Sequence, residues 1–221
     1  MVSFPASGSG HAEFVATGMI EKPYADATAR NSEAILSAIR TEFRDLESIL
    51  EIGSGTGQHA VFFCQALNNL VWQTSDVPGN HGGIRAWLAD ASLPNVLEPL
   101  ALDVLDAELP HESYDGVFSA NTAHIMNPEA VEKMFTLVAA VLRDSGIFVL
   151  YGPFRQGGRF NTPSNEGFHR SLRQRDPGMG IRHLEELDGF AQRGGMRRVR
   201  LYAMPANNNL AVWVKDGGVV T

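Results

Sequence analysis

Three things are scarce in this sequence: cysteine, long apolar runs and basic charge. The 221 residues contain one cysteine, so no internal disulfide can form, and we expect a reducing, cytoplasmic location. That residue, Cys64, follows two phenylalanines in an apolar segment, which favours buried packing over a reactive thiol. No apolar run reaches the roughly eighteen residues that a membrane-spanning helix needs, and the first residues lack a signal-peptide pattern. We therefore predict no membrane association.

Acidic residues outnumber basic ones, 25 to 18, and the net charge is −7. A nucleic-acid-binding surface usually carries a basic stripe, whereas the one arginine cluster here, in 193–200, is interpreted as a solvated face. The seven histidines show no short metal-ligand spacing, so we predict no metal and no nucleic-acid partner. The length and the 44% apolar content suit one α/β domain over 1–221, with a Gly- and Ser-rich segment 1–18 that we expect to be mobile.

The most informative segment is an apolar strand that runs into a glycine-rich turn and then a helix. Residues 46–59 read LESILEIGSGTGQH, with the glycines at Gly53, Gly55 and Gly57. Glycine has no Cβ and tolerates left-handed backbone angles, so such a turn brings backbone amides and a helix N-terminus close to a polar ligand. The dinucleotide fingerprint would place its third small residue where Gln58 stands. The spacing therefore favours S-adenosylmethionine over NAD.

Polar side chains end the later apolar runs. Asp76 closes the run 70–76, where a carboxylate can accept hydrogen bonds from both ribose hydroxyls; the alternative is an exposed turn residue. Asp103 closes the third run and could accept a hydrogen bond from an adenine amino group. Asn121 and Tyr151 end the fourth and fifth runs. Because ligands of open α/β sheets bind at the carboxyl ends of the strands, these tips predict one shared site.

These segments resemble the class I S-adenosylmethionine-dependent methyltransferases. More narrowly, the chain is similar to a family labelled a domain of unknown function, whose animal members are called methyltransferase-like protein 26. The similarity runs from about residue 22 to the end of the chain. Its segments include Pro23-Tyr24, Ala29-Arg30-Asn31, 50–63, Ser75-Asp76, 118–121, His124-Ile125, 151–154, Ser164-Asn165, Phe168, 171–173, Gly180-Ile181-Arg182 and 204–208. The chain departs from the family pattern at Met179, where the family has Trp, and at His169 and His183, where it has Asp.

The resemblance implies a Rossmann-like α/β class I methyltransferase fold. Such a fold has a mostly parallel seven-stranded sheet, a C-terminal antiparallel hairpin and helices on both faces. The implied cofactor is S-adenosyl-L-methionine, with S-adenosyl-L-homocysteine as its product. The residues expected to bind it are Glu51, Gly53, Gly55, Gly57, His59, Asp76, Asp103, Val104, Asn121 and Arg30. Two alternatives stay open: His59 orders the glycine turn, and Arg30 is an exposed residue at a helix start.

His124 is the candidate catalytic residue. Methyl transfer from a sulfonium mainly needs alignment of acceptor, methyl and sulfur, and such positioning is worth roughly 7–11 kcal/mol. A base is needed only when the acceptor arrives protonated. His124 follows Asn121 at the mouth of the predicted sheet, and an unperturbed imidazole pKa of about 6.5 suits a base at neutral pH. The alternative is a histidine that packs or caps within its loop.

Residues 152–183 form a connection far longer than the usual link between a strand and a helix. We interpret this segment as a substrate-binding or lid insertion; the alternative is a surface excursion with a short helix near 165–173. The residues expected to bind substrate are Tyr24, Tyr151, Asn165 and Arg173.

Helix and strand signals complete the predicted order. Apolar periodicity predicts a helix that begins near Asn31, and Asn127 followed by proline predicts the N-cap of another. A third helix should stop at Gly194. The runs 199–204 and 210–214 predict a hairpin.

Functions of different classes remain. The first is methyl transfer to a small uncharged or cationic molecule by in-line displacement, performed by a monomer or homodimer. The second is a catalytically silent S-adenosylmethionine-binding domain that serves as a partner or regulator. An NAD-dependent enzyme is disfavoured by Gln58. The sequence does not distinguish nitrogen, oxygen and sulfur acceptors.

Overall fold

A computed structural model of the chain describes residues 22–106 and 113–217, so the segment 1–18 lies outside the described residues. Seven strands form one sheet in the order β3-β2-β1-β4-β5-β9-β8. The first five are parallel, and β9 is antiparallel to both of its neighbours, which confirms the predicted sheet and C-terminal hairpin. The strands are β1 Ser48–Ile52, β2 Val71–Asp76, β3 Val96–Ala101, β4 Tyr114–Ala120, β5 Leu142–Gly152, β8 Met196–Met204 and β9 Asn208–Lys215.

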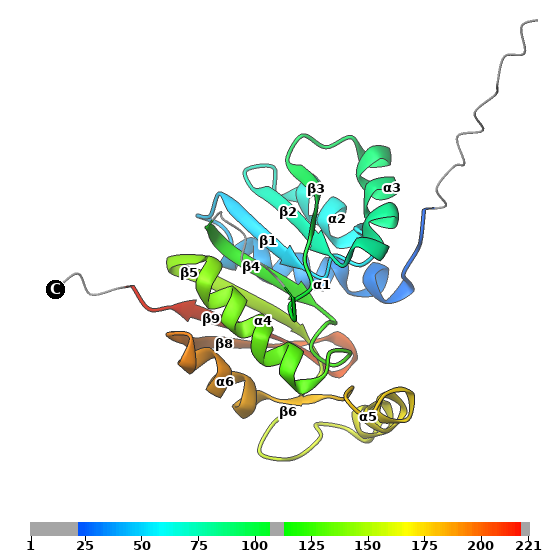
Figure 1. The fold of residues 1–221 in the computed structure, drawn as a ribbon, viewed down its shortest axis with the longest axis vertical. Helices are drawn as coiled ribbons and strands as arrows, with labels where there is room; N and C mark the ends of the chain where they lie inside the picture. Colours follow the sequence, from blue (N-terminus) through cyan, green and yellow to red (C-terminus); the bar gives the residue numbers. More distant parts are fainter. Residues whose placement is uncertain (1–21, 107–112, 218–221) are drawn as a thin grey trace, which may run out of the picture.

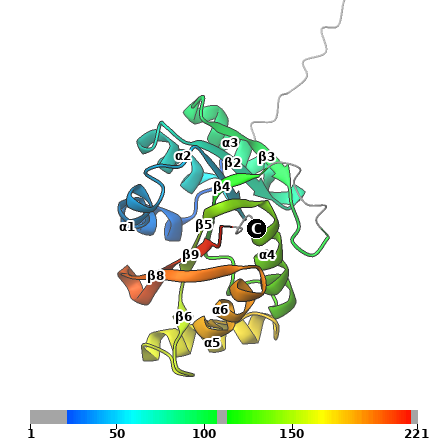
Figure 2. The same cartoon turned by 90° about the vertical axis from the view of Figure 1, so that its left-hand side faces the viewer.

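Helices cover both faces of the sheet, as Figures 1 and 2 show. The face packed by α1, α2 and α3 has its own buried cluster, and α4 and α6 share the cluster on the opposite face. The helices are α1 Asp26–Glu42, α2 Gln58–Ala66, α3 His81–Ala91, α4 Pro128–Val141, α5 Pro163–Arg175 and α6 Leu184–Arg193. Two short 3-10 helices, η1 Pro78–Asn80 and η2 Pro205–Asn207, lie in connections between these elements.

The insertion 152–183 leaves the main sheet at the end of β5. Its ends are drawn together by a parallel pair of short strands, β6 Phe154–Arg155 and β7 Arg182–His183. Between them, α5 lies below the sheet and apart from the other helices (Figure 1). The insertion therefore contains a helix longer than the short one considered from the sequence.

Aromatic side chains fill both cores. In one, the rings of Phe63, Trp72 and Phe118 lie 5.5–5.6 Å apart. In the other, the rings of Phe135 and Trp213 meet at 5.4 Å, edge to face. Burying each such side chain stabilises the fold by about 1.5–3 kcal/mol. These contacts fix the strands, and so fix the positions of the loops that follow them.

Helix ends follow the predicted signals, with one difference. The side-chain oxygen of Asn127 accepts a 2.8 Å hydrogen bond from the backbone N–H of Ala130, which confirms the predicted cap of α4. The helix α6 ends at Arg193 and is followed by Gly194 as its C-cap, as predicted. The helix α1 begins at Asp26 rather than near Asn31. The sequence pattern missed this first turn because its residues are mostly exposed and carry no apolar periodicity.

The order of the strands reverses between β1 and β4, which are neighbours in the sheet but distant in the sequence. At such a point the loops that leave adjacent strands diverge and open a crevice. Here the glycine turn follows β1, Asp76 ends β2 and Asn121 follows β4. The fold thus brings three predicted strand tips to one edge.

Candidate functional site

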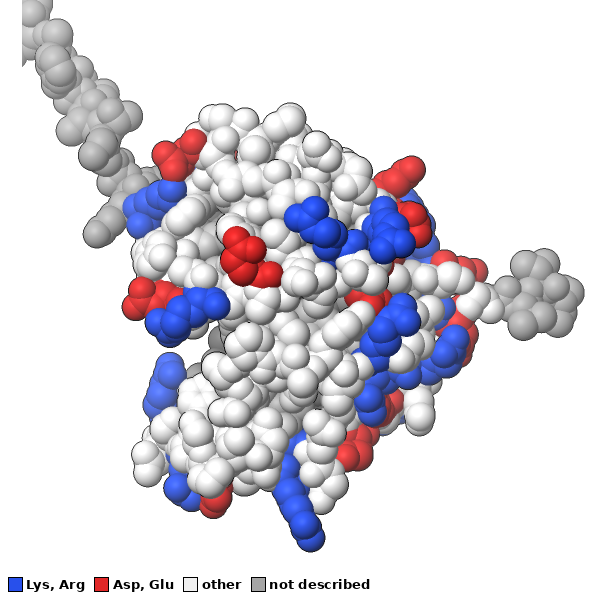
Figure 3. Space-filling model, turned by 180° about the vertical axis from the view of Figure 1, so that it is seen from behind, with Lys and Arg blue, Asp and Glu red and all other residues white. Residues whose placement is uncertain are grey.

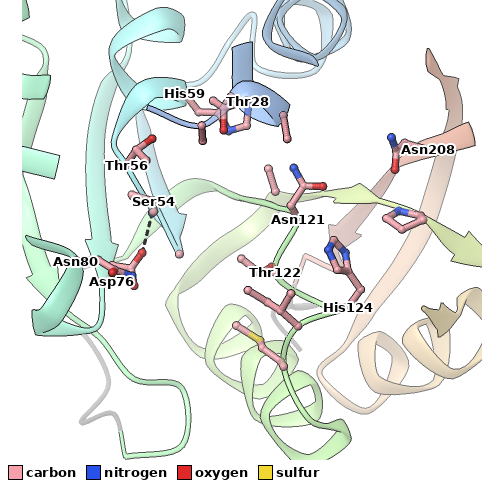
Figure 4. Close-up of a pocket in the computed structure, with 18 of the residues that line it drawn as sticks. Thr28, Ser54, Thr56, His59, Asp76, Asn80, Asn121, Thr122, His124 and Asn208 are labelled. Carbon is pink, nitrogen blue, oxygen red and sulfur yellow. Dashed lines mark hydrogen bonds between the residues drawn. The ribbon is translucent and has the colours of Figure 1, made fainter. Parts of the chain in front are cut away.

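A cavity of about 1040 Å³ opens at this edge of the sheet. In Figure 4, Asp76 and Asn80 lie at one end, His124 and Asn208 lie at the other, and Asn121 lies between them. Asp76 has the only charged side chain among the described residues that line the cavity. The predicted site residues that the fold brings to this wall are Gly53, Gly55, His59, Asp76, Asn121, His124 and Asn165.

The glycine turn is held in left-handed backbone angles. Gly53, Gly55 and Gly57 have φ of 74°, 59° and 86°, which residues with a Cβ rarely adopt. A Cβ on Gly53 would lie 2.6 Å from the methyl group of Thr122, and one on Gly57 would lie 3.1 Å from the backbone of Ile84. A Cβ on Gly55 would meet nothing within 4 Å. Two glycines therefore permit close packing, and Gly55 leaves room at the cavity wall.

Asp76 ties the tip of β2 to this turn. Its Oδ2 accepts a 2.7 Å hydrogen bond from the backbone N–H of Gly55. Its Oδ1 accepts 2.8 Å hydrogen bonds from the backbone N–H of Val77 and from the side chain of Asn80. Carboxylate oxygens have further lone pairs, so Asp76 can still accept hydrogen bonds from a ligand in the cavity.

Glu51 supports the turn from beneath and does not line the cavity. It is 1% exposed, and its Oε2 accepts hydrogen bonds from Ser54 Oγ at 2.9 Å and from the ring N–H of Trp72 at 3.1 Å. Burial raises the pKa of Glu51 to about 7, because desolvation outweighs the two hydrogen bonds that lower it. In this structure Glu51 therefore fixes the position of the Ser54 side chain through a hydrogen bond.

Gln58, the residue that departs from the dinucleotide fingerprint, holds the segment 23–28 over the cavity. Its Oε1 accepts a 2.5 Å hydrogen bond from the backbone N–H of Ala25. Nearby, the ring N–H of Trp87 donates to the carbonyl of Pro23 at 2.6 Å. Residues of this segment line the cavity, so Gln58 of α2 and Trp87 of α3 together position this part of the cavity wall.

His59 lies at the cavity wall at the start of α2. Its Nε2 is 2.7 Å from Asn31 Oδ1, so the ring donates through Nε2–H to this carbonyl oxygen. The ring stacks on Phe63 at 5.2 Å and meets the edge of Phe118. Burial lowers the pKa of His59 to about 4, so the imidazole is neutral at physiological pH.

The loop between β4 and α4 carries Asn121 and His124. Asn121 has a φ of 62°, a left-handed conformation that asparagine tolerates better than most residues. His124 is 8% exposed and meets the ring of Phe168 edge to face at 5.4 Å. Burial, followed by the nearby charge of Arg182, lowers the pKa of His124 to about 4. His124 is therefore a neutral hydrogen-bonding group and a weaker base than its unperturbed pKa suggested.

Arg182 fastens this loop to the insertion. Its Nε donates to the carbonyl of Ala123 at 3.0 Å, and its Nη2 donates to the carbonyls of Met126 and, at 2.6 Å, Gly178. The backbone N–H of Gly180 donates to the carbonyl of His124 at 2.9 Å. The loop that bears His124 is thus held by hydrogen bonds from the side chain of Arg182 and from the backbone N–H of Gly180.

The insertion supplies part of the cavity wall. Asn165 and Phe168 of α5 line it, as does Pro153. The side chain of Asn165 donates to the carbonyl of Asn207 at 2.9 Å, which connects α5 to the turn between β8 and β9. Part of the insertion therefore faces the cavity, and the substrate role expected for 152–183 stays a prediction.

Several predicted residues do not line the cavity: Glu51, Gly57, Asp103, Val104, Arg30, Tyr24, Tyr151 and Arg173. Arg30, Asp103 and Arg173 are exposed elsewhere. Tyr24 is 65% exposed and lines a separate cavity of about 430 Å³. Tyr151 is 2% exposed, and its burial raises the pKa of its hydroxyl. Ligand contacts of these eight residues stay predictions.

Other residues of the wall had no role assigned from the sequence. They include Thr28, Ser54, Thr56, Asn80, Asn208 and Phe168. Ser54, Thr56, Phe168 and Asn208 lie in segments that carry the family resemblance, which is the one signal that could have marked them. Thr28 in α1 and Asn80 in η1 are small polar residues, a common type with no ligand signature of its own.

The surface arginines of β8 are paired with carboxylates. Arg197, Arg198 and Arg200 contact Asp216, Asp188 and Glu42 respectively. On the face seen in Figure 3, acidic and basic side chains lie close together. Within residues 22–106 and 113–217, no helix has the length and apolarity to cross a membrane. The same described residues hold no group of three or more His, Cys, Asp or Glu side chains suited to a metal ion.

The strand order, with a cavity at the carboxyl ends of the strands, is that of the class I methyltransferase fold, as predicted. An O-methyltransferase family protein from Burkholderia thailandensis matches with a TM-score of 0.77 at 15% identity, over 87% of this chain and 58% of its own. The mitomycin 7-O-methyltransferase MmcR matches with 0.75 at 15% identity, over 86% and 54%. Human N-acetylserotonin methyltransferase, in complex with SAM, matches with 0.71 at 13% identity, over 86% and 53%.

The chain spans little more than half the length of these solved structures. At such identities the likeness establishes the fold. A family model described as "Protein of unknown function (DUF938)" matches residues 22–215, and the chain belongs to this family.

Proposed function

We propose that the chain transfers a methyl group from S-adenosylmethionine to a small-molecule acceptor by in-line displacement. The observation that carries this proposal is one continuous cavity, with the glycine turn and Asp76 at one end and His124 at the other. Solved structures of the same fold include PigF with SAH and human N-acetylserotonin methyltransferase in complex with SAM, which supports the same cofactor here.

The residues of the first end fit an adenosyl group. Gly55 offers a backbone that a ligand can approach, because no Cβ fills the space. Asp76 would accept hydrogen bonds from the ribose hydroxyls, and Ser54 and Thr56 add hydroxyl groups to the same wall. When bound, S-adenosylmethionine supplies an electrophilic methyl group. The roles of Gly53, His59 and Asn121 in holding the cofactor belong to this proposal.

His124 would orient the acceptor. A ring whose pKa is about 4 is neutral at pH 7, so it can accept a hydrogen bond from an acceptor hydroxyl or thiol. It holds a proton weakly, which suits catalysis by positioning more than full proton removal. Asn165 and Phe168 of the insertion would complete the acceptor side.

The setting that we propose is a cytoplasmic monomer or homodimer without a nucleic-acid partner. The cavity, at about 1040 Å³, has the size of a small-molecule site. A relationship to methyltransferase-like protein 26 would extend the same activity to the animal proteins.

Methyl incorporation tests the proposal. The protein is incubated with methyl-labelled S-adenosylmethionine and fractionated small metabolites, and labelled products are separated by chromatography. We expect a labelled small molecule that disappears with heat-inactivated protein. Binding of S-adenosylhomocysteine without incorporation into any fraction would favour the catalytically silent domain instead.

A further inference from the structure

The end of the cavity opposite Asp76 has a distinct chemical character. Its wall is formed by Asn121, His124, Pro153, Asn165, Phe168 and Asn208, which we call the neutral chamber. These side chains offer amides, one imidazole and apolar surface, and none carries a charge at pH 7. A substrate carboxylate or phosphate would find no arginine fork here, and an ammonium would find no carboxylate.

Apolar surface is left open beside these polar groups. Phe168 is 40% exposed and Ile125 is 48% exposed, and both line the cavity. Phe168 presents its ring to His124 at 5.4 Å, edge to face. Exposed aromatic surface in a cavity favours a flat apolar ligand, because aromatic pairs stabilise a complex beyond the burial of their area.

Three guanidinium groups lie behind the chamber without a paired carboxylate. Arg182 donates its hydrogen bonds to backbone carbonyls, those of Ala123 and Met126 in the His124 loop and that of Gly178. A Cβ on Gly180, whose N–H bonds to the His124 carbonyl, would lie 3.4 Å from Cδ of Arg173. Arg155 has a buried Nε with no hydrogen-bond partner. None of the three arginines forms an ion pair among the described residues.

These charges act on the chamber. The nearby Arg182 contributes to the lowered pKa of His124, after burial, and Arg155, Arg173 and Arg182 all act to lower the pKa of His169 on α5, again after burial. Glu186 is the carboxylate whose charge opposes this effect at Arg155 and Arg182. At His124 the one charge that acts is the positive charge of Arg182, which disfavours a second cation beside this ring and favours loss of a proton from a bound acceptor.

We propose, on the basis of the proposed function, that the neutral chamber selects an uncharged acceptor with a weakly acidic hydroxyl or thiol on a flat apolar body, and that it rejects ammonium groups. The acceptor oxygen or sulfur forms the new bond to the methyl carbon, the methyl–sulfur bond breaks with its electron pair going to sulfur, and the acceptor proton leaves to water. An amine would instead carry positive charge after attack, against the positive charge of Arg182.

Two probes with the same number of heavy atoms test this selection. The protein is saturated with S-adenosylhomocysteine, and 4-methylphenol and benzylammonium are titrated separately at pH 7 by ligand-observed NMR. We expect benzylammonium to bind at least roughly tenfold more weakly, because a like charge must enter near Arg182 without a partner. Equal or tighter binding of benzylammonium, or no binding of either probe, would overturn the proposal.

Asn208→Asp places a carboxylate in the chamber without changing side-chain size, and should bring the two affinities close together. Asn68→Asp adds the same charge at an exposed position before β2, outside the cavity, and should leave the ratio unchanged. An equal response of both variants would assign the preference to overall charge and overturn the role of the chamber. Binding of S-adenosylhomocysteine is measured first. Its failure would refute the proposed function, and the same titrations on ligand-free protein would still report the charge preference of the chamber.

Discussion

The carboxylate of Asp76 accepts a 2.7 Å hydrogen bond from the backbone N–H of Gly55. This bond joins the tip of β2 to the turn after β1, so the cavity wall is assembled before any ligand arrives. A preassembled wall loses less entropy on binding than one that must be ordered by the ligand. The same carboxylate would serve both the turn and the ribose.

Asp76→Asn should weaken binding of S-adenosylhomocysteine. The loss of a charged hydrogen-bonding group costs about 1.5–3 kcal/mol, which is roughly a 10- to 150-fold loss of affinity. Asp115→Asn is the matched control: Asp115 also accepts backbone hydrogen bonds, from Glu47 and Ser48, but it does not line the cavity. Calorimetry should show an affinity change for the first variant alone. An unchanged affinity for Asp76→Asn would leave Asp76 as a turn residue.

Substitutions at two glycines of the turn should have different effects on stability and on ligand binding. Gly57→Ala forces a Cβ to within 3.1 Å of the backbone of Ile84 in a left-handed conformation, so it should lower the free energy of unfolding by more than the roughly 1–2 kcal/mol of backbone strain alone. Gly55→Ala meets no neighbour and should cost only that strain, yet it should obstruct the cofactor. Denaturant unfolding and ligand titration of both variants measure this. If Gly55→Ala and Gly57→Ala lose affinity in the same proportion to the stability that each loses, Gly55 has no separate role at the cavity wall.

Acid should destabilise the protein through His59 and His124. The pKa of each is about 4 in the folded state against 6.5 ordinarily. Between these values the unfolded chain takes up protons that the folded chain does not, so stability falls as pH falls from 6.5 to 4. Each shift is worth roughly 3 kcal/mol. His59→Gln or His124→Gln should flatten the pH dependence of unfolding, and an unaltered slope would show that the ring was never buried as a neutral group.

Glu51 should act in the opposite direction. Burial raises its pKa from 4.5 to about 7, so the unfolded chain loses this proton first and stability falls as pH rises through that window. Glu51→Gln keeps an oxygen for Ser54 and Trp72 and removes the charge. We expect the variant to be more stable than the wild type at pH 8, by up to roughly 3 kcal/mol, and similar at pH 4.5. Lower stability at pH 8 would mean that the ionised carboxylate is needed.

The parts of the site that sequence reasoning identified are those encoded locally. The glycine turn and Asp76 follow their strands directly, so a short stretch of sequence reports both the element and its polar tip. Asn208 and Phe168 reach the cavity only because β9 returns beside β5 and α5 folds back to His124. Such contacts between distant segments leave no periodic or motif signal. The lowered pKa of His124 likewise depends on burial and on Arg182, which the sequence separates by more than fifty residues.

The most direct test of the central claim is a calorimetric titration with S-adenosylhomocysteine, paired with thermal unfolding. We predict one site per chain. Ligand at a hundred times its dissociation constant should stabilise the fold by about 2.7 kcal/mol, which is a rise of roughly 5–10 °C in Tm for a domain of this size. No binding heat and no shift with S-adenosylhomocysteine, alongside a clear shift with NADH, would contradict the account.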